Sequence, residues 1–160
     1  MATGGDDRRR SRGNSMMRMM LAAGAVALGV TAALAQANVI QQRQSHMKEY
    51  GEQTRTVSGM LRGQVPFNLA QVQTALRTYS ENARAMAPLW PETSKTGNDT
   101  KALPVIWEKK ADFDQRLAKL AQDAQAAAAA IKDEATFKTE FPKVLQNCGG
   151  CHETYRQKTT

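Results

Sequence analysis

Apolar side chains recur at helical spacing throughout residues 36–160, and no stretch there alternates apolar and polar residues as a strand would. In the clearest series the steps are three and four residues in turn: Leu69, Val72, Leu76, Tyr79, Ala83 and Met86. Asn68 stands before this series as a helix N-cap, and Pro88 stops it. The pattern therefore predicts an amphipathic helix between Asn68 and Pro88.

An earlier helix is predicted from about residue 39 to residue 61. Ile40 and Met47 lie on a seven-residue series that continues to Leu61, which indicates a stripe facing the core. Gly63 and Pro66 follow directly and end this helix.

Two more helices are predicted after the polar connection bounded by Pro91 and Pro104. The third helix carries these residues on one side: Ile106, Phe113, Leu117, Leu120, Ala124 and Ile131. The fourth starts between Asp133 and Thr136, and Pro142 is expected only near a first turn or at a kink. One face of the fourth helix holds Phe137, Phe141, Val144, Leu145, Cys148, Cys151, His152 and Tyr155. Four amphipathic helices with mostly short connections predict an all-α fold, an antiparallel up-down-up-down four-helix bundle.

Residues 1–35 have the three parts of a secretory signal peptide. A basic stretch precedes an apolar core of modest length, which ends in the small-x-small triplet at residues 33–35. Cleavage after Ala35 would leave one domain, residues 36–160, exported to the periplasm. Translation starting at Met16 or Met17 would place residues 1–15 upstream of the protein. A retained membrane anchor is the alternative, but the apolar run barely reaches the ~20 residues of a spanning helix and is mostly Ala and Gly.

The formal net charge of +7 belongs largely to the leader. Without residues 1–35, 17 basic and 13 acidic side chains remain, so the charge falls to +4. No cluster of Lys and Arg with interleaved aromatic residues is left, which argues against nucleic acid as a partner. Removal of the leader also takes away the one segment suited to stable membrane insertion. No nucleophile–base pair or carboxylate dyad indicates catalysis, so an enzyme is not predicted.

The two cysteines of the chain, Cys148 and Cys151, lie within the motif CGGCH near its end. A disulfide between them would close a loop of only a few residues and would stabilise the fold little. A thioredoxin-type redox pair requires a βαβ context, which this sequence lacks. A zinc site would need four ligands, and His46 is the one histidine outside the motif.

The spacing of the two cysteines in CGGCH also suits covalent haem attachment. Two thiols one helical turn apart can each add to a haem vinyl group, and the adjacent His152 then presents a ring nitrogen to the iron. Gly149 and Gly150 keep side-chain bulk away from the porphyrin edge. Together with export, two cysteines in total and a helical bundle, the motif favours one covalently bound haem c.

With CHETYR on its last helix, the chain resembles the cytochrome c′ family, the class II cytochromes c, over its whole mature length. RQSHMKEYG is similar to the family's first-helix signature, RGQVPFNLAQV to its first turn and second helix, and LPVIWEKKADFDQ to its third helix. The resemblance implies a four-helix bundle with covalently attached haem that carries single electrons in the periplasm. Its partners would be redox proteins that the sequence does not identify, and pairing through the first two helices would make it a homodimer.

The family divides by what lies opposite the histidine. In the low-spin type a first-helix methionine is the sixth ligand of the iron, and in the high-spin type an apolar residue leaves the iron five-coordinate. Met47 falls at this position of RQSHM, and a thioether is a soft ligand suited to haem iron. The resemblance therefore implies His152 and Met47 as the axial ligands. The alternative is a five-coordinate protein that binds nitric oxide or carbon monoxide, with Met47 as a packing residue.

Further side chains are expected near the haem. Arg43 and Gln44 match family positions at the haem edge, where a cation and an amide could bond the propionates. Arg156 follows His152 by one turn and could lie beside the haem or be a solvated cation at the helix end. His46 points about 100° away from Met47 and is predicted to be solvated. Core aromatic residues are expected at Trp90, Trp107, Phe113 and Tyr155.

Overall fold

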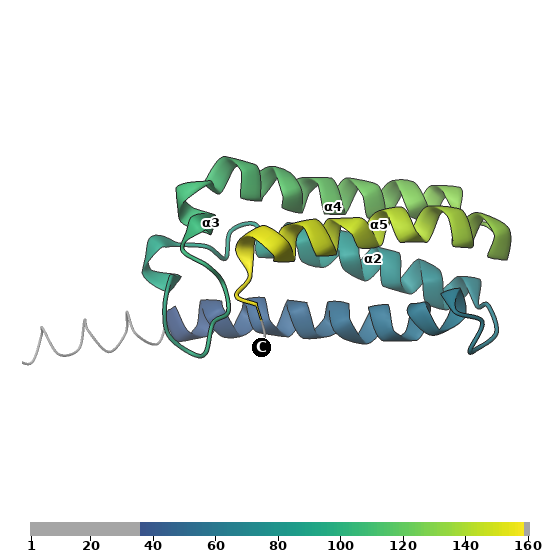
Figure 1. The fold of residues 1–160 in the computed structure, drawn as a ribbon, viewed down its shortest axis with the longest axis horizontal. Coiled ribbons are helices and arrows are strands. Elements are labelled where there is room, and N and C mark those ends of the chain that lie inside the picture. The colour runs from purple at the N-terminus through teal and green to yellow at the C-terminus, as the bar shows by residue number, and fades with distance from the viewer. Residues whose placement is uncertain (1–35, 159–160) are drawn as a thin grey trace, which may run out of the picture. The chain divides into compact units, whose positions relative to one another are not determined.

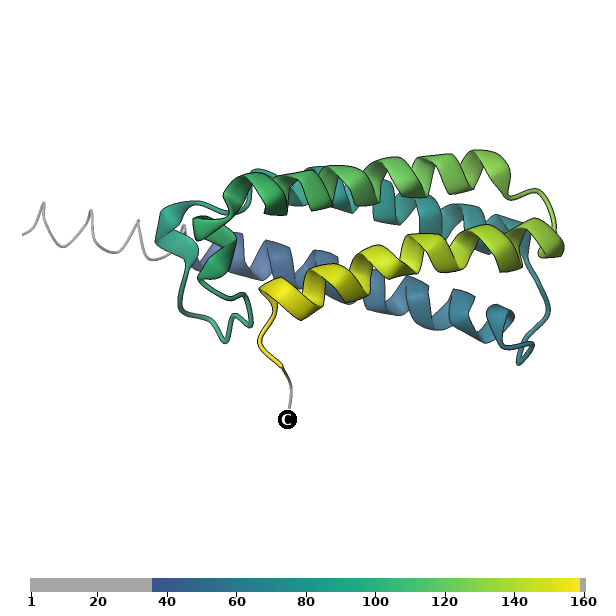
Figure 2. The same ribbon diagram turned by 45° about the horizontal axis from the view of Figure 1, so that its top comes forward.

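The computed structural model describes residues 36–158, and the chain divides into two compact units, residues 1–38 and 39–160. The second unit is a bundle of antiparallel helices (Figure 1, Figure 2). Residues 36–61 form the first helix, which is followed by α2 (Leu69–Met86), α4 (Lys110–Ala130) and α5 (Glu134–Tyr155). Between α2 and α4 lie the 3-10 turn η1 (Glu92–Ser94) and the short helix α3 (Val105–Glu108). The predicted all-α four-helix bundle is confirmed.

The predicted signal peptide and its cleavage after Ala35 fall outside the described residues and stay predictions. None of the helices in residues 36–158 combines the length and the hydropathy that a membrane-spanning segment requires.

Side-chain caps explain where two of the helices begin. The Asn68 side chain accepts a hydrogen bond from the backbone N–H of Gln71 at 3.1 Å, as predicted for the N-cap of α2. Asp133 caps α5 in a capping box with Thr136, because the Asp133 side chain accepts from the Thr136 N–H and the Thr136 hydroxyl accepts from the Asp133 N–H. The first helix ends at residue 61, and Gly63 in the following turn has a positive φ of 68°, which suits a residue without a Cβ.

One helix boundary differs from the prediction. The single third helix expected from Ile106 is divided, because the backbone of Lys109 leaves helical geometry between α3 and α4. The indole N–H of Trp107 donates to the carbonyls of Trp90 and Pro91, which fastens α3 to the connection instead of to the axis of α4. Pro142 lies in the interior of α5 and not in its first turn, and a kink at this position stays a prediction.

The middle of the core is aromatic and joins α2 to α5 and to the first helix. Tyr79 and Phe141 are each at most 1% exposed, and their ring centroids lie 6.1 Å apart. The Tyr50 hydroxyl of the first helix donates to the Tyr79 carbonyl at 3.1 Å, and the hydroxyls of Thr54 and Tyr79 are 2.7 Å apart. These bonds hold the first helix against α2.

A second aromatic cluster holds the end of α5 against α4 and the connection before it. The ring of Phe113 contacts those of Trp90 and Tyr155, with centroids 4.6 Å and 5.2 Å apart. The Leu103 N–H also donates to the Tyr155 carbonyl at 3.0 Å. Trp90, Phe113 and Tyr155 are buried, as predicted, and Trp107 is partly buried. This cluster fixes the position of the last turn of α5, which carries His152.

Candidate functional site

Cys148 and Cys151 share one face of α5 with core residues but are less buried than these. Val144 before them is 1% exposed and Tyr155 after them is 3% exposed, whereas both cysteines are half-buried. Both are free thiols, and burial raises the pKa of each. At neutral pH they are therefore two protonated thiols, one helical turn apart and partly accessible.

Cys148 lies at the level of Tyr50 on the first helix. Burial is the main cause that raises the pKa of the Tyr50 phenol, and the nearby Cys148 adds to this effect. The first helix and α5 run antiparallel (Figure 1, Figure 2), so three residues back on the first helix correspond to three residues forward on α5. Met47, one turn before Tyr50, is therefore displaced from Tyr50 toward the end of α5 that carries Cys151 and His152.

Met47 is accessible although its neighbours on the same face of the helix are not. At 100° per residue, Met47 lies within about 60° of both Arg43 and Tyr50 around the helix axis. Arg43 is 4% and Tyr50 8% exposed, but Met47 is 37% exposed. Met47 is therefore not covered by the protein as Arg43 and Tyr50 are, and its role as ligand or as packing residue stays a prediction. The arrangement leaves its thioether available to a group held between the first helix and α5.

His152 is half-buried in the last turn of α5. Burial, and to a smaller extent the charge of Arg156, lowers the pKa of the His152 imidazole. The ring is therefore neutral at physiological pH, which is the protonation state that a metal ligand requires. Arg156 is exposed at the C-cap of α5 and close enough to His152 to act on it electrostatically.

Protein packing does not explain the two glycines of the motif. A Cβ placed on Gly149 would have no atom within 4 Å, and one on Gly150 would meet only the Arg116 guanidinium, at 3.9 Å. Both positions have room for a side chain, so the space beside them is available to a bound group.

Arg43 and Gln44 have partners in the connection between α2 and α3. The Arg43 guanidinium donates to the Ser94 carbonyl at 2.9 Å and stacks 4.3 Å from the centroid of the Trp90 ring, while burial lowers its pKa to about 10. The Gln44 amide donates to the Asn98 carbonyl at 2.8 Å. These contacts hold the connection against the first helix. The proposed propionate contacts of both residues stay predictions.

Trp90 was not expected to offer a polar group to the site. Its indole N–H is buried without a hydrogen-bond partner in the described part of the chain, and its ring lies against Arg43. A buried donor of this kind is costly unless an acceptor reaches it. In the sequence Trp90 is an aromatic residue between two prolines. That its indole N–H is buried without an acceptor could not be predicted from the sequence.

His46 is not the solvated residue that was predicted. Its side chain is 22% exposed, and its Nδ1 atom is buried 3.8 Å from the Glu49 carboxylate. The Asn82 amide of α2 donates to the same carboxylate at 2.6 Å. This cluster lies on the side of the first helix that faces α2, and His46 is not brought together with Met47.

Asp112 and Arg116 of α4 belong to the surroundings of the motif, although they were not singled out from the sequence. Arg116 donates to the Asp112 carboxylate and to the Gly150 carbonyl, each at 2.9 Å. The Tyr155 hydroxyl donates to the same carboxylate oxygen. The i, i+4 spacing of Asp112 and Arg116 is visible in the sequence, but the contact with α5 depends on how the two helices pack.

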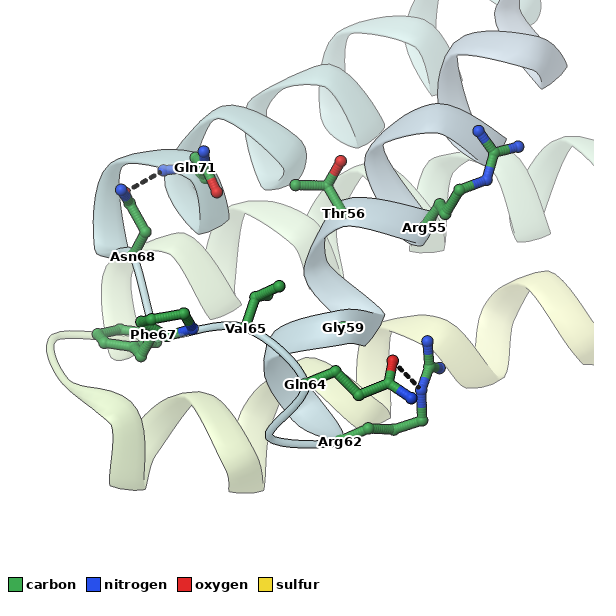
Figure 3. A pocket seen from close by; sticks show the side chains of 10 residues that line it. Arg55, Thr56, Gly59, Arg62, Gln64, Val65, Phe67, Asn68 and Gln71 are labelled. Carbon is green, nitrogen blue, oxygen red and sulfur yellow. Dashed lines mark hydrogen bonds between the residues drawn. The ribbon is translucent and has the colours of Figure 1, made fainter.

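A separate groove lies at the other end of the first helix, where it turns into α2 (Figure 3). It has a volume of about 660 Å³ and is lined by residues that include Arg55, Arg62, Val65 and Asn68. Gly59 in this groove is 12 residues from Met47, about 18 Å along the helix. The groove contains neither cysteine nor histidine and is not continuous with the motif.

Taken together, the residues around CGGCH fit a covalently bound haem. The last turns of α5 carry two half-buried thiols and a neutral histidine beside glycines with free space around them, and the first helix, which runs antiparallel to α5, carries an accessible methionine. The zinc alternative finds no support in residues 36–158, where no three His, Cys, Asp or Glu side chains are grouped to hold a metal ion.

Comparison with known proteins agrees with this geometry. The sequence profile of the family "Cytochrome C'" matches residues 38–156. A cytochrome c′ of Rhodopseudomonas palustris is 45% identical over 89% of this chain and 97% of its own length. A cytochrome c-556 of the same organism is 32% identical over 89% of this chain and 99% of its own length.

The solved structure of the cytochrome c′ from Rhodopseudomonas palustris superposes on this one with a TM-score of 0.75. It is 45% identical and covers 76% of this chain and 98% of its own. The chain therefore belongs to the cytochrome c′ family, a family of mono-haem c-type cytochromes that bind their haem covalently.

Proposed function

We propose that this protein is a periplasmic one-electron carrier in which His152 and Met47 are the two axial ligands of the haem iron. Haem supplies one iron that passes between the ferric and the ferrous state by gain or loss of a single electron. The electron would come from one redox protein and go to another, so no bond of a substrate is made or broken and no catalytic residue is required.

Each protein group has a distinct part in this proposal. Cys148 and Cys151 would form the two thioether bonds that keep the haem in the bundle. His152, held neutral by burial, would donate a ring nitrogen on one side of the iron. Met47 would donate its sulfur on the other side. Keeping both ligands in both oxidation states limits rearrangement, which suits rapid electron exchange.

The buried donors of the connection suggest how the haem edge would be held. Arg43 stays cationic at physiological pH, and the Trp90 N–H beside it lacks an acceptor in the described part of the chain. A propionate carboxylate is an acceptor that both groups could bond.

The accessibility of Met47 is the observation that carries the choice of ligand. A methionine packed into the protein core would be as covered as Arg43 and Tyr50 on either side of it, yet Met47 is 37% exposed. The competing function is a five-coordinate protein that binds nitric oxide or carbon monoxide, with Met47 lining the site. It is favoured by the relative at 45% identity, which is named cytochrome c′.

Replacing Met47 by Leu tests the proposal. Met47→Leu keeps volume and apolarity, so it should cost less than about 1.5 kcal/mol of stability. Without the thioether, the ferrous protein should bind carbon monoxide much faster than the wild type, because no ligand has to be displaced first. The matched control is Met60→Leu, a buried methionine of the same helix, which should leave binding unchanged. Equal carbon monoxide binding by Met47→Leu and the wild type would contradict the ligand assignment.

A further inference from the structure

An ion pair on α4 reaches across to the backbone of the CGGCH motif on α5. The Arg116 Nε atom donates to Asp112 Oδ2, and its Nη1 atom donates to the carbonyl of Gly150, both at 2.9 Å. The second contact joins residues 34 apart in the sequence, from two different helices. Arg116 is therefore positioned by Asp112 against the residue that precedes Cys151.

Tyr155 completes this arrangement from the side of α5. Its hydroxyl donates to Asp112 Oδ2, and the Arg116 guanidinium lies 5.4 Å from the centroid of its ring. Asp112 thus accepts from both helices with the same oxygen. The ion pair lies within α4, and two groups of α5 hold it in place, the Gly150 carbonyl and the Tyr155 hydroxyl.

We propose that Asp112 and Arg116 are positioning residues that set the reduction potential of the haem joined to Cys151, Arg116 raising it and Asp112 lowering it. The proposal rests on the proposed function to the extent that it requires haem at Cys151. The physical reason is the sign of the two charges. Reduction adds one negative charge at the iron, which a nearby cation favours and a nearby anion opposes.

Both charges are close enough to the attachment site to act on it. Arg116 bonds the carbonyl of the residue that precedes Cys151, and Asp112 accepts a hydrogen bond from Tyr155, one helical turn after Cys151. The side chains are 38% and 48% exposed, so salt screens them in part. Hydrogen bonds to Gly150 and Tyr155 hold the two charged side chains in place. An ion pair without such bonds would move more freely at the surface.

The test is a spectroelectrochemical titration of the purified holoprotein at one pH and low ionic strength. Arg116→Met removes a cation with little change of length, and Asp112→Asn removes an anion with little change of shape. We expect the midpoint potential to fall in Arg116→Met and to rise in Asp112→Asn. Arg116→Lys keeps the charge and should stay close to the wild type. Added salt should reduce both shifts.

The matched control is the ion pair of Glu134 and Lys138 in the first turns of α5. Lys138 is 14 residues from His152, about 21 Å along the helix. Lys138→Met and Glu134→Gln should therefore move the potential much less. If Arg116→Met does not accumulate haem, Arg116→Gln takes its place in the same titration.

A purely structural role would give a different pattern. Loosening of the motif would move the potential in the same direction in Arg116→Met and Asp112→Asn, and Arg116→Lys would not restore it. That pattern, or shifts no larger than those of the control pair, would overturn the proposal. The visible spectra of the same samples report the axial ligands separately, so a failure of the Met47 assignment is distinguishable from a failure of this one.

Discussion

The two cysteines are more exposed than the core residues on the same face of α5. Val144 and Tyr155 share their face of α5 and are almost completely buried, whereas Cys148 and Cys151 are only half-buried. Core packing therefore does not account for the thiols. Covalent attachment of a haem would account for them.

Replacing both thiols should abolish covalent haem. In Cys148→Ala with Cys151→Ala, no sulfur remains to form a thioether, so haem staining after denaturing electrophoresis should be lost. Thr154→Ala, one change on the same helix that spares the motif, should stain like the wild type. Retention of haem by the double variant through denaturation would contradict the attachment.

Some residues of the site could be predicted from the sequence and others could not. Cys148, Cys151 and His152 were predicted from the motif CGGCH together with export, two cysteines in total and a helical bundle. Met47 was predicted as an axial ligand through the family resemblance alone. Its exposure could be seen only in the structure. The contact between Arg43 and Ser94 could not be predicted, because the two residues are 51 positions apart and meet only when the connection folds back.

At the scale of the elements, local capping sets where α5 begins and thereby the register of its last turn. Asp133 starts the helix, and the motif follows four turns later on the face that Phe137 and Phe141 define. The helical spacing predicted these starts correctly, because caps and apolar periodicity are local properties. The break between α3 and α4 was missed, since Trp107 finds its partners in another segment.

The Asp133 cap should make stability depend on pH. The hydrogen bond from the Thr136 backbone N–H is the largest cause that lowers the pKa of Asp133 in the folded protein. A carboxylate with a lowered folded pKa stabilises the fold above its unfolded value of about 3.9, and the gain is lost as pH falls through the folded pKa. Asp133→Asn keeps a capping oxygen without this titration.

Urea unfolding of the wild type and Asp133→Asn at pH 7 and at pH 3 measures this effect. The free energy of unfolding should fall more steeply with acidification in the wild type than in Asp133→Asn. Identical pH dependence in both proteins would show that the charge of this cap does not contribute to folding.

At the scale of the whole molecule, four antiparallel helices bring the first helix and the last one together around the motif. The bundle was predictable from spacing and connection lengths. The antiparallel order of the helices places the start of the first helix beside the end of α5 that carries His152 (Figure 1). The contacts of Asp112, Arg116 and Trp90 could not be predicted, because they depend on the rotation of each helix about its own axis.

Export should remove residues 1–35. The intact mass of protein recovered from the periplasm should correspond to a chain that begins at Gln36 and carries one haem. A membrane-bound form that begins at Met1 or Met16 would instead mean that the leader is kept as an anchor.

The visible absorption spectrum of the purified wild-type protein tests the ligation by His152 and Met47 most directly. Two strong axial ligands make the ferrous haem low-spin and six-coordinate, so we predict sharp, split bands that change little when carbon monoxide is first added. A single broad high-spin band with an immediate response to carbon monoxide would contradict ligation by Met47 and would identify the protein as a gas-binding member of its family.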